Sequence, residues 1–251
     1  MGANAFTMTP NTGTGNVYQS AELTLASLTR SAGATVNFSG TNMGQVGNTG
    51  RLYITQDPTL AAPGLLGAWA IANTTDYAAY NSSSGVGVVG QGGFVGYSQA
   101  FGSGNITNLM TTGTSFLTVA GTNTLAAGTT TTAMLRIGGA FPSDLAFATA
   151  NGVLNLELGG LLRSNDAQVT NIGTTVLPGT LTVGGTATSG TRELVAYVAN
   201  AGGTLTINSL IRNLNQVTGT GSAALALVKS GAGTLTLSAT NTYTGGTTVS
   251  Q

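Results

Sequence analysis

Acid–base chemistry in this chain would have to come from its carboxylates, because its 251 residues include neither histidine nor cysteine. Those two types supply the usual base near neutral pH, most transition-metal ligands and the thiol nucleophile. Cleavage of a glycosidic bond needs two carboxyl groups about 5–10 Å apart. Only folding could bring Asp166 beside Asp144 or Glu157, since the closest acids are nine residues apart in the sequence. Exposed charges seldom mark sites, so we expect Glu157, Arg163 and Asp166 to be solvated or paired surface groups. The seven acids are Glu22, Asp57, Asp76, Asp144, Glu157, Asp166 and Glu193.

Two further motifs could bind a ligand, and in both the context favours a structural role. GVGVVG at Gly85–Gly90 matches the dinucleotide fingerprint, which needs a preceding strand, a following helix and an acid about 20 residues later. Here NSSS precedes it and the next acid is Asp144, which favours a glycine-rich corner. Trp69, Tyr77 and Tyr80 could form a sugar-stacking platform, but the alanines beside them favour core-filling aromatics. With no GxSxG elbow and no Asp-x-Asp loop, the sequence predicts no catalytic residue, metal site or cofactor, and no enzyme.

Sparse and balanced charge disfavours several classes of partner. Seven basic and seven acidic residues occur in the whole chain. The basic residues are scattered, whereas binding of nucleic acid needs clustered Lys and Arg. Residues 77–135 carry no charge, yet Gly, Gln and Ser interrupt their apolar stretches, so no transmembrane helix is predicted. The 39 glycines together with 41% hydrophobic residues indicate ordered, turn-rich β-structure rather than disorder.

Short strands of one pattern recur along the chain, which indicates a repeat architecture. A glycine precedes alternating residues in GATVNF, GVLNLEL, GTLTVG, GTLTIN and GTLTLS. The steps between Leu154, Leu181, Leu205 and Leu235 are 27, 24 and 30 residues. Steps of this length are typical of one turn of a parallel β-helix with loops of unequal length. We therefore expect these four leucines to be buried and stacked in one column.

Alternation decides how such strands pack. In TLTL the leucines face one side and the threonines the other, so a single strand is half-buried and unstable alone. Coils stacked about 4.8 Å apart would build an apolar column inside and a threonine-rich surface outside. The sequence therefore predicts an all-β fold, a right-handed parallel β-helix (solenoid) of about ten coils at roughly 25 residues each.

The whole chain, 1–251, is expected to form a single β-helix segment with three zones. Residues 1–45 form N-terminal coils, and residues 46–150 form irregular coils that contain the single Trp and most of the Tyr and Phe. Residues 151–251 form regular repeat coils. The stretch 65–90 is predicted to contribute longer coils of the same helix.

The segment 227–250 contains all the parts of one coil. It has two glycine turns, the strand TLTL, an Asn-Thr-Tyr corner and a second threonine-rich strand, and runs KSGAGTLTLSATNTYTGGTT from Lys229. It resembles the passenger-associated transport repeat, the autotransporter-associated β-strand repeat of secreted bacterial surface proteins. The residues expected to form the structural repeat are Gly231, Gly233, Leu235, Leu237, Asn241, Tyr243, Gly245 and Gly246.

The resemblance implies both a role and a location. It implies a non-enzymatic, stiff stalk of a secreted or surface-displayed bacterial autotransporter-type passenger, whose repeats aid secretion and extracellular folding. An alternative is a self-assembling extracellular filament subunit, because open ends of a solenoid can pair with other copies or with a continuation of the same solenoid. A less favoured alternative is a β-helix protein that binds carbohydrate or cleaves polysaccharide. A surface or polysaccharide ligand therefore stays open.

Both ends of the sequence lack expected features. The N-terminus has no basic region followed by an apolar core, so it is not a signal peptide, and for an exported protein Met1 would mark the cut edge of a longer chain. No cap follows the strand TTVS, so we expect the C-terminal end to associate with another segment or to fray.

Overall fold

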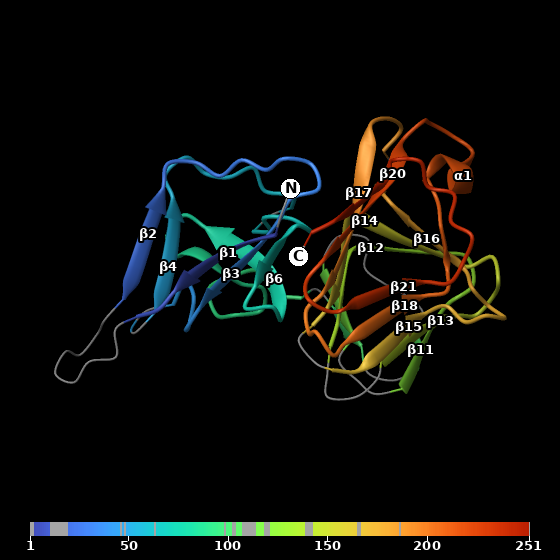
Figure 1. Cartoon of the computed structure of the whole chain (residues 1–251), viewed down its shortest axis with the longest axis horizontal. Helices are drawn as coiled ribbons and strands as arrows, with labels where there is room; N and C mark the ends of the chain where they lie inside the picture. Colours follow the sequence, from blue (N-terminus) through green and yellow to red (C-terminus); the bar gives the residue numbers. More distant parts are fainter. Residues whose placement is uncertain are drawn as a thin grey trace. The chain divides into compact units, whose positions relative to one another are not determined.

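The computed structural model describes residues 3–10, 20–45, 47, 49–62, 64–97, 99–101, 104–106, 114–117, 121–138, 143–164, 167–185 and 187–250. In this part the chain is mostly β-strand with mainly parallel pairing, which confirms the predicted all-β parallel class. The chain divides into two compact units, Met1–Gly96 and Tyr97–Gln251. Unit 1 runs from blue to green in Figure 1 and unit 2 from green to red. Each unit has its own arrangement of strands.

Unit 1 contains one mixed sheet and one separate strand pair. The sheet has three parallel strands followed by two antiparallel ones, in the order β1 (Ala3–Met8), β3 (Thr35–Gly40), β5 (Ala70–Ala72), β6 (Asp76–Asn81) and β7 (Gly85–Val88). The separate parallel pair is β2 (Ala21–Leu25) and β4 (Gly50–Ile54), visible side by side in Figure 1.

The antiparallel strands of unit 1 differ from the longer parallel coils expected over residues 65–90. Asn73 and Thr74, between β5 and β6, have positive φ angles of 52° and 60°. Such a backbone is that of a type I′ hairpin turn, which reverses the chain within two residues. A second reversal precedes Gly85, whose φ is 77°, and there Ser84 N donates to Asn81 Oδ1 at 2.7 Å. Because both turns reverse the chain locally, β6 pairs with its sequence neighbours β5 and β7 rather than with a strand one coil away.

Unit 2 is a stack of parallel strands in which the chain visits three strips in one repeating order. Strip 1 comprises the first halves of β12 (Thr129–Ile137) and β14 (Val153–Arg163), then β16 (Thr180–Val183) and β19 (Leu210–Ile211). Strip 2 comprises β8 (Gln99–Phe101), β10 (Thr114–Leu117), the second halves of β12 and β14, β17 (Thr191–Val198), β20 (Ala224–Ser230) and β22 (Thr247–Val249). Strip 3 comprises β9 (Gly104–Ile106), β11 (Gly121–Leu125), β13 (Ser143–Phe147), β15 (Val169–Ile172), β18 (Thr204–Ile207) and β21 (Thr234–Leu237). Figure 1 shows the strands of strip 3 from β11 to β21 as successive layers.

A glycine corner makes the long strand β14 turn from strip 1 to strip 2. Gly159 has a φ of 75°, and a Cβ at this position would overlap the carbonyl oxygen of Glu193 on the next layer. Only glycine fits both the backbone conformation and the close approach. Residues before the corner pair with β16 and residues after it pair with β17. One strand therefore belongs to two strips.

The four leucines predicted to share a column lie in two different columns. Leu154 pairs with Leu181 in strip 1, whereas Leu205 pairs with Leu235 in strip 3. The first three are fully buried, and Leu235 is half-buried against the same core. The prediction of one column is wrong because the Thr-Leu-Thr pattern occurs in strip 1 and in strip 3. The step from Leu181 to Leu205 therefore leads from strip 1 to strip 3 of the same coil, and not to the next coil.

Coils of unit 2 differ in length. From Ile172 to its partner Ile207 the chain covers 35 residues, and from Ile207 to its partner Leu237 it covers 30. From Leu125 to its partner Phe147, by contrast, it covers 22. The coils are therefore unequal in length, and the short helix α1 (Asn215–Thr218), which follows β19, lies in the coil from Ile207 to Leu237. The expectation of about ten coils over the whole chain fails in residues 70–88, where β5, β6 and β7 pair antiparallel.

Candidate functional site

The predicted repeat residues lie in the last layer of the unit 2 stack. Leu235 and Leu237 of β21 pair with Leu205 and Ile207 of β18, and their half-buried side chains pack against the core cluster. The threonines between them are exposed. Alternating residues thus place one apolar face of the strand on the layer below and leave a polar surface outside.

Two of the four repeat glycines are required by their contacts with the layer below. A Cβ at Gly231, whose φ is 77°, would overlap the carbonyl oxygen of Val198. A Cβ at Gly233 would lie 2.5 Å from the carbonyl oxygen of Asn200. At Gly233 the backbone N–H donates to Val198 O at 2.8 Å, so the chain turns directly on top of the preceding coil. The lack of a side chain permits this close approach.

The second glycine pair, Gly245 and Gly246, starts β22. Gly245 N donates to Leu225 O at 2.7 Å, and a Cβ there would lie 2.6 Å from that same oxygen. Gly246 has a φ of 82°, and its carbonyl accepts from Leu227 N at 2.9 Å. This pair therefore hydrogen-bonds the chain to β20 at the corner where β22 begins.

Asparagine side chains fasten the repeat to the preceding coil. Asn241 Oδ1 accepts from Ile211 N at 2.8 Å. Asn213, which is 6% exposed, accepts with Oδ1 from Leu225 N at 2.8 Å and from Thr244 N at 3.1 Å, and donates from Nδ2 to Thr244 Oγ1 at 2.8 Å. Asn241 was expected from the sequence to serve a corner, but Asn213 was not singled out. No pattern in the sequence distinguishes Asn213, because it is one Asn in a polar segment outside the repeat.

Tyr243 and Lys229 complete the layer. Tyr243 packs its half-buried ring against the core, and its hydroxyl lies 2.7 Å from Thr247 Oγ1. Lys229 is 8% exposed and donates from Nζ to the carbonyl of Gly231. Burial lowers the pKa of Lys229 below its ordinary value, and burial raises the pKa of the neighbouring Tyr197.

Comparison with protein families identifies this layer. A family model described as passenger-associated-transport-repeat matches residues 227–251. The last coil of unit 2 is thus similar to this transport repeat. Searches of curated proteins and of solved structures find no match to the chain. The repeat covers β21, β22 and the end of β20, so the asparagine contacts above join it to the coil that precedes it.

The transport repeat also presents two strand edges. Within the described part of the chain, β21 pairs with β18 and β22 with β20, and each has a partner on one side only. Val249 in β22 is 63% exposed. The backbone groups of the outer edges are therefore available to a further strand.

Of the acids in the candidate pairs, the structure describes Asp144 and Glu157. Asp144 Oδ1 accepts from Asn171 N at 2.8 Å and from Asn171 Nδ2 at 3.0 Å, so this carboxylate links two layers of strip 3. Glu157 lines a groove on strip 1. Asp166, the partner proposed for both, lies outside the described residues.

Arg163 departs from the surface role expected for it. The side chain is 1% exposed at the end of β14, and its guanidinium donates to Ile137 O at 3.5 Å and to Gln168 O at 3.4 Å. The expectation of a solvated or paired surface group is wrong, because carbonyl groups of β12 and of the segment after β14 accept from the buried guanidinium. A buried guanidinium that is used in this way holds a loop in place.

The aromatic residues of unit 1 separate into two groups. Tyr77 and Tyr80 are 1% and 5% exposed, which confirms the core-filling interpretation for them. The Tyr80 hydroxyl donates to Ile54 O at 3.0 Å, and burial raises the pKa of Tyr80. Trp69 is half-buried, with the Arg30 guanidinium 5.7 Å from its ring centre. One face of the only tryptophan is therefore already occupied by a cation.

The GVGVVG segment has the structure of a hairpin. β7 forms its first part and a turn follows, where Phe94 N donates to Gln91 O at 3.0 Å. A Cβ at Gly87 would overlap the ring of Phe94. No helix opens after the glycines, so the nucleotide-binding interpretation fails and the glycine serves close packing.

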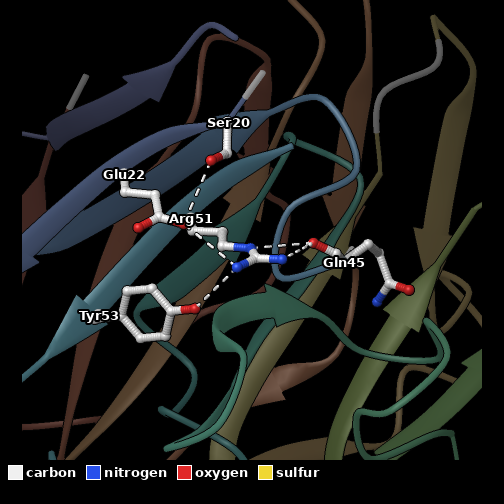
Figure 2. Close-up of polar contacts among 5 residues, drawn as sticks. All are labelled: Ser20, Glu22, Gln45, Arg51 and Tyr53. Carbon is white, nitrogen blue, oxygen red and sulfur yellow. Dashed lines mark hydrogen bonds and ion pairs between the residues drawn. The ribbon is translucent and has the colours of Figure 1, made fainter. Parts of the chain in front are cut away.

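Unit 1 carries a polar cluster on the β2–β4 pair, drawn in Figure 2. Arg51 donates from Nη1 to Glu22 Oε1 at 3.3 Å and to the Tyr53 hydroxyl at 3.5 Å, and its Nε and Nη2 both donate to Gln45 O at 3.2 Å. Ser20 Oγ donates to the same Glu22 oxygen at 3.4 Å. The guanidinium donors are used within the cluster, which therefore joins two strands and a loop.

Two further searches give negative results. Among the described residues, no group of three or more Asp, Glu, Cys or His side chains is arranged to hold a metal ion. No helix in the described part of the chain is long and apolar enough to cross a membrane.

Proposed function

We propose that this chain is a non-enzymatic structural segment of an autotransporter-type passenger, secreted or displayed on the bacterial surface. In this proposal unit 2 is a right-handed parallel β-helix that acts as a stiff stalk, and its last coil aids secretion and extracellular folding. The support is the transport repeat at residues 227–251, a type of repeat named for its association with passenger transport.

One structural observation carries the proposal. The transport repeat continues the parallel ladder of the preceding coil and is joined to it by the side chains of Asn213 and Asn241. A repeat attached in this way can serve as a template on which neighbouring coils form, because each new strand needs an existing edge. Folding that proceeds by such addition can accompany emergence of the chain on the outer side of a membrane.

Export with altered repeats tests the proposal. The full chain is produced in front of an outer-membrane translocator, and the amount on the cell surface is measured by antibody labelling of intact cells. We expect Asn213→Ala combined with Asn241→Ala to lower surface display several-fold, and the exposed Thr236→Ala in the same coil to leave it unchanged. The purified variants are also refolded in vitro, so that slow folding is separated from degradation. Equal display and equal refolding of all three chains would refute the role of the repeat.

A second candidate function, a filament subunit, follows from the free edges of β21 and β22. An exposed edge with an apolar residue such as Val249 can pair with another copy or with a continuation of the solenoid. Light scattering over a concentration series distinguishes the two candidates. Growth of elongated particles favours the filament, and a constant mass favours the stalk.

A further inference from the structure

The outer surface of strip 1 contains a groove beside α1. Two adjoining cavities, of about 550 Å³ and 270 Å³, share Val153 of β14 and Val217 of α1 as lining residues. The floor is a ladder of outward-facing side chains in register, Thr131 on β12, Asn155 on β14 and Thr182 on β16. The apolar part of the lining comes from Val153, Leu214 and Val217. These strands thus bury leucine side chains on their inner face and present both polar and apolar side chains on their outer face.

Several polar groups in this groove have no partner within the described structure. Asn155 is 6% exposed, and its Oδ1 makes no hydrogen bond. Arg212, which lines the smaller cavity, has a buried Nε without a hydrogen-bond acceptor. Buried polar atoms are almost always hydrogen-bonded in folded proteins. An unpaired acceptor and an unpaired donor along one groove therefore indicate a missing partner.

The carboxylate of Glu157 and the hydroxyl of Thr131 add to this set. Glu157 is half-exposed, lies against Gly185 and forms no ion pair among the described residues. Thr131 is half-buried. The larger cavity thus offers hydroxyl, amide and carboxylate groups on one side and aliphatic side chains on the other.

We propose that this groove binds a neutral oligosaccharide. Sugar rings present hydroxyl groups that both donate and accept hydrogen bonds, which suits Asn155 and Glu157, and C–H faces that suit aliphatic walls. Among the described lining residues, the groove carries one carboxylate, Glu157, and one guanidinium, Arg212, so it has no net charge to attract an acidic ligand. The ladder Thr131–Asn155–Thr182 extends over two strand spacings, about 10 Å, which suits a short chain rather than a single ring.

Two other ligand types fit the groove less well. A peptide that adds as a strand needs free backbone groups, but the backbone of this face is used in the ladder between β12, β14 and β16. Cleavage of the bound sugar needs two carboxyl groups, and Glu157 is the one carboxylate among the described residues that line the larger cavity. The groove therefore binds without hydrolysis.

Titration calorimetry of the full chain tests this inference. The probes are cellohexaose, xylohexaose and maltohexaose, with hexagalacturonate as the acidic comparison. We expect saturable binding of at least one neutral probe and tenfold or weaker binding of hexagalacturonate. Failure of all three neutral probes to bind at millimolar concentration, or preference for hexagalacturonate, would overturn the proposal.

Variants separate binding from stability. Asn155→Leu removes the unpaired amide but keeps a buried side chain of similar size, so we expect at least tenfold weaker binding with an unchanged or higher Tm. Glu157→Gln should weaken binding at a half-exposed position that the fold does not need. Thr236→Ala, on strip 3, is the matched control and should bind like the unaltered chain. Unchanged affinity in Asn155→Leu and Glu157→Gln would place binding elsewhere and refute the site, whatever the outcome of the export experiment.

Discussion

The two units bury apolar surface in different ways. Unit 2 has a core of Leu, Ile and Val that recur in register from layer to layer, with Leu154 on Leu181 and Ile172 on Ile207. Unit 1 adds Phe, Tyr, Met and Ala to aliphatic residues such as Leu52, and Phe6 stacks on Phe38 of the parallel β1–β3 pair with ring centres 5.8 Å apart. The core of unit 2 is therefore mainly aliphatic, whereas the core of unit 1 mixes aromatic, aliphatic and small side chains.

The two units also differ in the direction of strand pairing, and this difference follows from local turns. The glycine corners of unit 2, such as Gly159 and Gly231, let the chain pass close over the layer below and continue in the same direction. The Asn73–Thr74 turn of unit 1 reverses the chain instead. Thus the direction of pairing depends on turn residues, although both units share alternating β-strands.

The largest expected effect concerns the core of unit 1. Phe38 is fully buried and stacked, so Phe38→Ala should cost about 3–5 kcal/mol of unfolding free energy. The only tryptophan, Trp69, belongs to unit 1 and reports that loss by fluorescence during denaturant unfolding. Far-UV circular dichroism, dominated by the strands of unit 2, should change much less. A parallel shift of both signals would show that the two units unfold together.

A matched change in unit 2 should act on the other signal. Leu205 is fully buried between layers, so Leu205→Ala should cost about 2–5 kcal/mol. Thr206→Ala, at the neighbouring outward position, should change stability by less than about 0.5 kcal/mol. If the two variants melt at the same temperature, the inward and outward assignment of β18 is incorrect.

The asparagine contact of the last coil should have an intermediate effect. Asn213→Ala leaves the N–H groups of Leu225 and Thr244 without their acceptor, which should cost about 1–3 kcal/mol. Hydrogen exchange measured by mass spectrometry should show faster exchange in residues 234–249 and little change in unit 1. Uniformly faster exchange across unit 2 would indicate that the last coil does not open separately.

The turn of unit 1 provides a smaller and opposite effect. Thr74 holds a φ of 60°, a conformation that costs about 1–2 kcal/mol for a residue other than glycine. Thr74→Gly relieves that strain at an entropic cost of about 0.5–1 kcal/mol, so unit 1 should become slightly more stable. The midpoint of tryptophan fluorescence in urea measures the change. A clear loss of stability would mean that the threonine side chain matters more than the turn.

The smallest effect is expected from pH. Burial lowers the pKa of Lys229 in the folded chain, so the unfolded chain binds more protons below the ordinary value of 10.5. Stability should therefore rise with pH as the medium approaches that value, and the rise should disappear in Lys229→Met. The comparison is made between about pH 7.5 and pH 9, below the pKa of about 10 at which tyrosines ionise. Identical slopes for the two chains would show that the lysine is solvated.

Much of the fold class could be predicted from the sequence, because alternation and glycine spacing are local signals. The transport repeat was likewise recognisable, since its glycines and Asn241 lie within one short segment. The assignment of strands to strips could not be predicted, because the same segment, GTLT, contains Leu181 in strip 1 and Leu205 in strip 3. The groove on strip 1 also escaped prediction, since Asn155 and Arg212 become neighbours of one surface only through the ladder and α1.

A disulfide test addresses the central claim, that the transport repeat continues the parallel stack in register. Thr206 and Thr236 are partners on β18 and β21, and the chain has no native cysteine to interfere. Thr206→Cys with Thr236→Cys should form an intramolecular disulfide readily, because adjacent strands lie about 4.8 Å apart, within the range that a disulfide spans. Thr206→Cys with Thr131→Cys, on another strip, should stay reduced. Mass spectrometry after mild oxidation that found no bond in the first pair, or bonds in both pairs, would contradict the stacked arrangement.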